Sequence, residues 1–374
     1  MICRMSRFRR GGAILAIATL FAFVGCSSTK GAKKIGVMLS LTGPGAQYGR
    51  MVLDGIDLAI TELNARPGAA AWTKVVEDDA TDPRIGFNAA QKLLDVDKVQ
   101  GLVGPIASSV ALAVAPLAGK QKILLLSPAA STPLLSGISP FVFRIYPSDT
   151  YDGAFLAKAA RNRLHLANVA ILYINNDFGS GLEKTFSETF TSLGGRITGR
   201  DTFNQGAATF RTQLTRLSNP PPDGLFLIAT VNDYIVALRQ MRELGLRWRV
   251  LAPVTFDDPV ILAQAGSAAE GVMYSRPAFD PKSSEAGVAG FVQIYRKKFG
   301  KDPSILNALG YDAANIMVKT LEAQPGGGDA AQAALRAMVY DGATGKVSFD
   351  KNGDVLKELQ LLEIRSGKAV PVGN

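Results

Sequence analysis

Small and hydroxyl-bearing residues recur in three segments of the chain, and each segment follows a short apolar run. The segments read LSLTGPGAQYGR (residues 39–50), VGPIASSV (103–110) and LSPAASTP (126–133). Loops of this kind lie at the carboxyl ends of strands in open α/β sheets, where ligands bind. We expect a helix to begin near Ser108 and to direct its free backbone N–H groups and positive dipole end at that place. Together these groups indicate a site for a small carboxylate, although any single serine is better explained as a helix cap or turn residue.

The sequence carries no motif of a known type of catalytic site. His165 is the only histidine, so a histidine-based zinc cluster is excluded and a Ser-His-Asp triad would need that residue. The segment FGSGL (178–182) lacks the first glycine of a nucleophile elbow. Residues 345–346 and 350–354 depart from phosphate-binding and calcium-binding loops, and 350–354 is better explained as a hairpin turn. We therefore expect a protein that is not an enzyme and that holds no metal and no cofactor.

Apolar runs alternate with amphipathic stretches, and these elements would position the three loops. The strand-like runs are residues 35–39, 101–103, 123–126, 169–174, 225–229 and 250–252. Most are continuous, as in parallel strands that are covered on both faces. Apolar residues recur at helical spacing from Val52 to Leu63 and from Leu182 to Leu193. This order predicts an α/β fold of two similar doubly wound, Rossmann-like lobes, which open at Ile35 and Val169.

The N-terminus has the pattern of a secretory signal. Four arginines within residues 4–10 precede an apolar run (11–24) that is shorter than the ~20 residues of a spanning helix. Gly25 and Cys26 follow, and this order resembles the lipobox of bacterial lipoproteins, with Phe23 where a leucine is usual. The resemblance implies that residues 1–25 are removed and that Cys26 is lipidated. A plain secretory signal or an uncleaved anchor is the alternative.

Composition agrees with an exported protein of two domains. The chain has 374 residues and two cysteines, and removal of Cys3 with the signal would leave no pair for an internal disulfide. A hydrophobic content of 47% over this length is enough for two buried cores. The net charge of +9 falls to +5 without the four arginines, and no dense basic run remains, so we expect no nucleic-acid partner. Residues 26–33 are predicted to be a polar tether.

Six segments in one order resemble a known family. They are LTGPGAQYG (41–49), DATDP (79–83), VGPIASS (103–109), LSPAASTP (126–133), FRIYPSD (143–149) and LYINNDFGSG (172–181). They are similar to the branched-chain amino-acid-binding proteins, the type I periplasmic solute receptors of ATP-driven (ABC) importers. The resemblance implies two lobes that are joined by three crossovers, with the ligand in the cleft. It places lobe one in residues 32–148 and 278–348, and lobe two in 149–277 and 349–374.

The same resemblance implies particular ligand-binding residues. Ser108 corresponds to the serine that binds the ligand carboxylate in the family. Backbone and hydroxyl contacts fall on Ala129, Ala130 and Ser131, and aromatic or polar contacts on Tyr48, Phe178 and Thr230 (or Val231). The family has a glutamate for the ligand ammonium, expected within residues 252–258, but this chain has none there. Asp257, or failing that Asp258, is the predicted substitute.

The resemblance implies a solute receptor. We expect a periplasmic or cell-surface protein, lipid-anchored to the membrane, that captures an amino acid or related small carboxylate and passes it to an ABC permease. The alternative is a lipoprotein that uses the same fold to regulate a partner protein. An extracytoplasmic enzyme is disfavoured by the missing catalytic groups.

Overall fold

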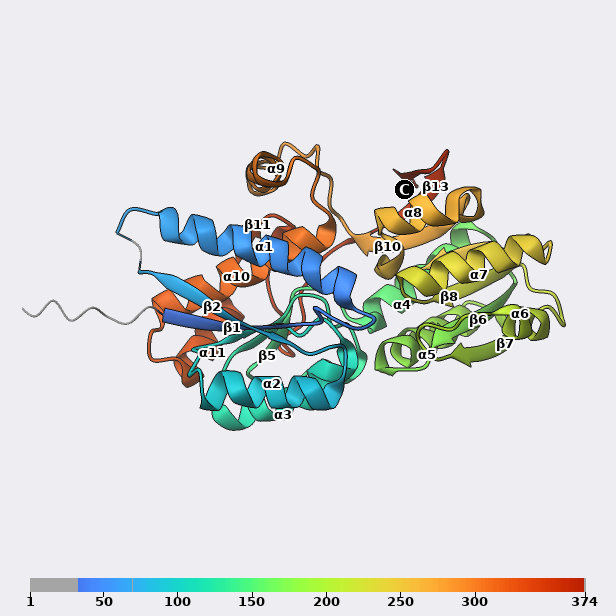
Figure 1. Ribbon diagram of the computed structural model, residues 1–374. Helices are drawn as coiled ribbons and strands as arrows, with labels where there is room; N and C mark the ends of the chain where they lie inside the picture. Colours follow the sequence, from blue (N-terminus) through green and yellow to red (C-terminus); the bar gives the residue numbers. More distant parts are fainter. Residues whose placement is uncertain (1–32, 69, 373–374) are drawn as a thin grey trace, which may run out of the picture. The chain divides into compact units, whose positions relative to one another are not determined.

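The computed structural model describes residues 33–68 and 70–372, which belong to one compact unit. The predicted signal, Cys26 and nearly all of the predicted tether lie outside the described residues. The described strands form a five-stranded sheet, a seven-stranded sheet and a two-stranded hairpin (Figure 1). We call each large sheet with the helices packed on it a lobe.

The first lobe is built on five parallel strands in the order β2-β1-β3-β4-β5. The strands are β1 (Lys33–Leu39), β2 (Trp72–Asp78), β3 (Leu102–Val103), β4 (Leu125–Ser127) and β5 (Val142–Arg144). Side chains of β1 point alternately to the two faces of the sheet, because successive residues of a strand project in opposite directions. Val37 packs with α1 (Ala46–Ala65) and α10 (Ile305–Ala323), whereas Met38 packs with α2 (Pro83–Asp95) and α3 (Ser108–Gln121). Figure 1 shows these two helix layers on opposite sides of the sheet.

Close packing of α1 against α10 fixes one layer of the first lobe. A Cβ atom on Gly55 would overlap the carbonyl oxygen of Asn307, and a Cβ on Gly310 would overlap that of Val52. The Asn307 amide also donates a hydrogen bond of 2.7 Å to the backbone oxygen of Met51. Two helices from opposite ends of the chain therefore approach at backbone distance. The C-terminal part of this lobe also holds α9 (Ala286–Phe299), α11 (Gly328–Ala337) and the hairpin β11 (Tyr340–Gly342) and β12 (Gly345–Val347).

The second lobe is built on seven strands in the order β14-β13-β10-β9-β8-β6-β7. Strands β6 to β10 are parallel, and β13 and β14 are antiparallel additions at one edge. Their bounds are β6 (Asn168–Ile174), β7 (Arg196–Phe203), β8 (Gly224–Ile228), β9 (Arg249–Ala252), β10 (Met273–Pro277), β13 (Leu359–Arg365) and β14 (Lys368–Pro371).

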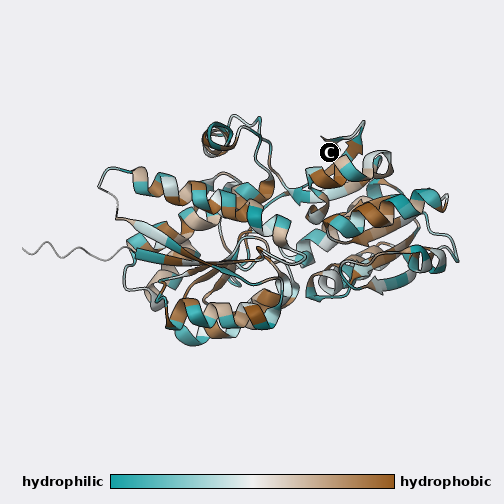
Figure 2. Cartoon of the chain, in the orientation of Figure 1, coloured by the Kyte–Doolittle hydropathy of each residue, from teal (hydrophilic) through white to brown (hydrophobic). Residues whose placement is uncertain are grey.

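Helices cover both faces of this second sheet. One face packs against α4 (Asp149–Lys158) and α5 (Asp177–Ser192), and the other against α6 (Arg211–Leu217), α7 (Val231–Glu243) and α8 (Pro259–Ala265). Because both faces are covered, strands such as β8 (GLFLI) are buried at every residue. Figure 2 shows apolar residues along the strands, while the helices carry apolar and polar residues together. The predicted α/β fold of two doubly wound lobes is confirmed.

The chain passes between the two lobes three times. It leaves the first sheet after β5, returns after β10, and enters the second sheet again at β13. The second lobe was predicted to begin again at residue 349. Asp354 still forms a parallel β-bridge with Arg144 of β5, which belongs to the first sheet. Residues 350–354 make the predicted hairpin turn, flanked by an antiparallel bridge between Phe349 and Val355. The lobe boundaries remain a prediction.

Within residues 33–68 and 70–372, no helix has the length and apolar character that crossing a bilayer requires.

Candidate functional site

The order of the strands places a ligand crevice in each lobe. In the first sheet, β1 lies between β2 and β3, so the loops that follow β1 and β3 lead to opposite faces. In the second sheet, β6 lies between β7 and β8 in the same way. Such switch points open a crevice at the carboxyl ends of the strands. Loops from both switch points line one cavity of about 230 Å³.

Neutral side chains line this cavity. It is smaller than the ~300–1,000 Å³ that is usual for drug-sized ligands, which suits a small metabolite. Among the described residues that line it, none is Asp, Glu, Lys, Arg or His. Its apolar walls comprise Ile106, Tyr146, Ile174, Phe178, Val254 and Leu306. Its hydroxyl and amide groups come mainly from Ser40, Ser108, Ser109, Ser131, Asn175, Asn176, Gln205, Thr230 and Thr255.

The first-lobe wall presents hydrogen-bond donors. Ser108 is the first residue of α3, and the N-cap Ala107 gives that helix no side-chain cap. The Ser108 hydroxyl oxygen accepts bonds of 3.3 Å and 3.2 Å from the backbone N–H groups of Ser131 and Thr132. Because this oxygen already accepts, its own proton remains for donation to a ligand. The uncapped helix start adds N–H groups and a positive dipole end, so this wall suits a carboxylate.

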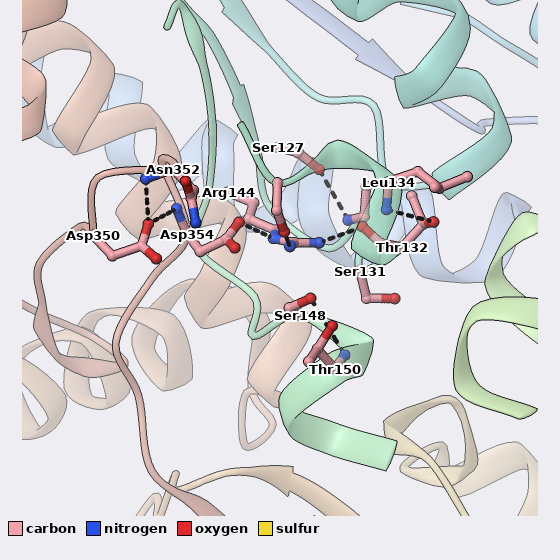
Figure 3. Close-up of polar contacts among 12 residues, drawn as sticks. Ser127, Ser131, Thr132, Leu134, Arg144, Ser148, Thr150, Asp350, Asn352 and Asp354 are labelled. Atoms are coloured by element: carbon pink, nitrogen blue, oxygen red, sulfur yellow. Dashed lines mark hydrogen bonds and ion pairs between the residues drawn. The ribbon is translucent and has the colours of Figure 1, made fainter. Parts of the chain in front are cut away.

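A buried arginine holds the loop that carries Ser131 (Figure 3). The Arg144 guanidinium is 1% exposed and donates through Nη1 to the Thr132 backbone oxygen at 2.8 Å. It also donates to the Ser136 hydroxyl at 2.5 Å and, through Nε, to Asp354 at 2.7 Å. Asp354 belongs to the hairpin turn at 350–354, so this turn supports the pocket loop. A charge pair between residues 210 positions apart leaves no local signal in the sequence, so this role was not predicted.

Glycine shapes the loop that leads to α3. Gly104 has φ of +106°, and a Cβ there would overlap the backbone oxygen of Met38. Glycine avoids both the strain of this backbone conformation and the overlap. The carbonyl of the next residue, Pro105, accepts a bond of 2.6 Å from the Ser127 hydroxyl, which links this loop to the strand before Ser131.

Helix caps fix the second-lobe wall. Asn176 accepts a bond of 2.9 Å from the Gly179 N–H and thereby starts α5, which places Phe178 at the cavity. Thr230 precedes α7, and its hydroxyl donates to Asp233 at 2.6 Å while accepting from Gln205 at 3.2 Å. The Thr230 oxygen is thus partly occupied by contacts within the lobe.

The two lobes touch at one edge of the cavity, through contacts that we call the latch. The Tyr48 hydroxyl donates to the Thr255 backbone oxygen at 2.9 Å. The Gln47 amide nitrogen lies 2.8 Å and 2.7 Å from the two carboxylate oxygens of Asp258. Asp258 also caps α8 by accepting from the Val260 N–H at 2.8 Å. Burial raises the pKa of Asp258 and that of Tyr48.

Two of the predicted site residues lie away from the cavity lining. Asp257 accepts from Arg276 Nη1 at 2.8 Å and from the Tyr274 hydroxyl at 2.7 Å, so its carboxylate is already paired. Ala130 is fully buried, and its N–H donates to the Ser127 hydroxyl. The structure brings the other six to the cavity: Tyr48, Ser108, Ala129, Ser131, Phe178 and Thr230.

Further lining residues escaped sequence analysis. Asn175, Asn176 and Gln205 follow strands of the second lobe, and Tyr146 lies in the first crossover. The two asparagines come directly after an apolar strand, and this position could have identified them as candidate lining residues. Gln205 follows β7, whose alternating pattern did not stand out as a buried strand.

Buried acids lie beside the crossovers. Asp152 accepts from the Ser275 hydroxyl at 2.5 Å and from the Tyr146 hydroxyl at 3.2 Å. Burial raises the pKa of Asp152 to about 6. Burial also raises the pKa of Asp149 well above its ordinary range, although the Ser131 hydroxyl opposes that shift. The Asp152 carboxyl group thus links Tyr146 of the pocket wall to Ser275 of β10.

Comparisons with known proteins agree with this architecture. A family model described as "Periplasmic binding protein" matches residues 33–369. A leucine-, isoleucine-, valine-, threonine- and alanine-binding protein from Pseudomonas aeruginosa is 28% identical over 358 residues, covering 93% of each chain. A Leu/Ile/Val-binding protein from Rhizobium johnstonii is 27% identical, covering 90% of this chain and 92% of the relative.

A solved structure adds a direct comparison of the fold. The crystal structure of a leucine-binding protein from Thermotoga maritima superimposes with a TM-score of 0.86 at 30% identity, and the match covers 91% of this chain and 98% of that one. Periplasmic binding proteins bind solutes and are not enzymes, as was predicted for this chain. The chain therefore belongs to the branched-chain amino-acid-binding family of type I periplasmic binding proteins.

Proposed function

We propose that this protein is an extracytoplasmic lipoprotein that captures an amino acid or a related small carboxylate between its lobes and delivers it to an ABC importer. The observation that carries the proposal is the wall around Ser108, where an uncapped helix start and two serine hydroxyls surround a cavity of metabolite size. The names of the relatives, which bind branched-chain and other small amino acids, support the same class of ligand.

Binding needs only modest energy from such a site. A micromolar dissociation constant corresponds to about −8 kcal/mol. A ligand of about nine heavy atoms reaches that value well within the ceiling of about −1.5 kcal/mol per atom. A carboxylate that accepts from Ser108, Ser131 and the start of α3 would contact the first lobe, and its remainder would contact the second. Contacts made only when both lobes meet favour the closed arrangement, which is the form a permease would recognise.

Thermal shift and calorimetry test the capture of a ligand. The mature chain should melt at a higher temperature with a small carboxylate or amino acid, because a ligand that binds only the folded state stabilises it. Ser108→Ala and Ser131→Ala should each weaken binding by about 1–3 kcal/mol, since a ligand oxygen loses its donor in a desolvated pocket. Ser192→Ala, at an exposed position near the end of α5, is the matched control. Unchanged affinity in both pocket variants would show that these serines are structural only.

The anchor is tested separately. Cys26→Ala should release the protein from membranes or block its processing, because acyl chains supply the membrane affinity. Mature protein that stays membrane-bound after this change would contradict lipidation at Cys26 and leave the ligand proposal untouched.

A further inference from the structure

The charge of the cavity restricts its ligand. An α-amino acid carries a carboxylate and an ammonium group, and a closed site must compensate both, because an unpaired buried charge costs several kcal/mol. The start of α3 and the serines beside it compensate the carboxylate. No acidic side chain lines the cavity in the described part of the chain, so nothing of opposite charge meets an ammonium group.

Three acids of the second lobe that lie close to the lining segments are already engaged. Asp257 is paired with Arg276 and accepts from Tyr274. Asp258 binds the Gln47 amide with both oxygens and also caps α8. Asp233 accepts from the Thr230 hydroxyl and from the Gly206 N–H. Recruiting any of them to a ligand would break contacts that hold the second-lobe wall or the latch.

The groups that remain on the second-lobe wall are neutral. Asn175, Asn176 and Gln205 offer amide groups and two threonines offer hydroxyls, while Ile174, Phe178 and Val254 supply apolar surface. An apolar or neutral polar ligand end satisfies this wall, whereas an ammonium group would lose its hydration without gaining an ion pair.

We propose that the ligand is a small monocarboxylate with an apolar or neutral far end and without an ammonium group. This inference rests on the proposed function and narrows it. The carboxylate binds at the start of α3, and the hydrocarbon part packs between the apolar residues of both lobes. Specificity against amino acids follows from the cost of burying their ammonium group.

Matched pairs of compounds test the inference by calorimetry on the mature chain. The pairs are 4-methylpentanoate with L-leucine, and 3-phenylpropanoate with L-phenylalanine, which differ only by the ammonium group. The neutral 4-methylpentanamide serves as the control for the carboxylate. At least one amine-free carboxylate should bind ten times or more tightly than its amino acid and than the amide.

The outcomes separate this inference from the proposed function. Amino acids that bind as tightly as their amine-free partners, or more tightly, would overturn the inference and leave the receptor function intact. An amide that binds as well as the acid would also overturn it, because the site would then not select a carboxylate. No binding by any acid or amino acid of the panel would count against the proposed function itself.

Adding an acid to the wall gives a second test. Thr255 lines the cavity, so Thr255→Glu adds a carboxylate there, and Thr255→Gln is the neutral control of equal size. The glutamate variant should shift the preference between L-leucine and 4-methylpentanoate by at least tenfold toward leucine, relative to the glutamine variant. Asn175→Asp makes the isosteric change at another lining position and serves if position 255 does not tolerate the larger side chain. If the acidic variants fold but keep the preference for 4-methylpentanoate over L-leucine, the lack of an acid in the cavity does not cause that preference.

Discussion

Replacing Asp152 by asparagine should change how the stability of the protein depends on pH. The Asp152 carboxyl is fully buried and accepts from the hydroxyls of Ser275 and Tyr146. Burial disfavours its charged form and raises the pKa from 3.8 to about 6. Between these two values the folded protein binds a proton that the unfolded chain releases. The stability that this group contributes is therefore full below about pH 4 and is lost as the pH rises through 6.

The pKa difference gives the size of the effect. Each unit of pKa corresponds to 1.36 kcal/mol, so the shift from 3.8 to about 6 amounts to about 3 kcal/mol at neutral pH. Asparagine keeps an acceptor for Ser275 and offers its amide to the Tyr146 oxygen, as the protonated acid does. The free energy of unfolding of Asp152→Asn should thus resemble that of the wild type near pH 4 and exceed it by up to about 3 kcal/mol above pH 7.

Urea denaturation of both proteins from pH 4 to pH 8 measures this difference. Asp149, whose pKa burial also raises, is present in both proteins and cancels to first order. A difference in unfolding free energy that stays constant with pH would refute the reasoning, because it would mean that Asp152 is charged in the folded state throughout. A difference that grows as the pH falls would refute its sign.

Three further changes should have outcomes that follow from contacts described above. Asp257→Asn should lower the melting temperature measured without ligand in a thermal scan, because Arg276 loses the charge that pairs with it. An unchanged melting temperature would mean that Asp257 contributes nothing to the stability of the empty protein. Gly310→Ala should lower the free energy of unfolding by about 1–3 kcal/mol in urea titrations through overpacking of α1 and α10, whereas Gly326→Ala, which meets no neighbouring atom, should have little effect. Gln47→Ala should increase the radius of gyration of the ligand-free protein in solution scattering, since the latch loses its hydrogen bonds to Asp258; an unchanged scattering profile would mean that the remaining contacts hold the lobes together.

The alternating elements of the fold were predictable because their signals are local. The continuous apolar run at residues 169–174 became β6, and the Gly-Pro-Ser segment after residue 103 led into α3. A buried strand and a helix start are both determined mainly by residues that are neighbours in sequence. The edge strands β2 and β7 did not stand out, because their partial exposure admits charged and polar residues such as Lys74 and Arg200.

Contacts between residues distant in sequence could not be predicted from the sequence. Asp257 has the residue type and approximate position for pairing with an ammonium group, but its pairing with Arg276 depends on how β10 lies beside the loop after β9. The support that Arg144 gives to the pocket loop depends in the same way on a turn near the C-terminus. The resemblance to a family located the segments of the site. Only the three-dimensional arrangement showed which of their side chains are not already paired within the protein.

The interleaving of the chain between its two lobes has a consequence for biosynthesis. The first lobe needs α10, which ends at Ala323, to cover α1, and the second sheet needs β13 and β14, which end at Pro371. A nascent chain that has emerged only as far as residue 300 therefore lacks part of both hydrophobic cores. Such long-range closure slows folding and keeps native structure from forming on the ribosome until synthesis is almost finished.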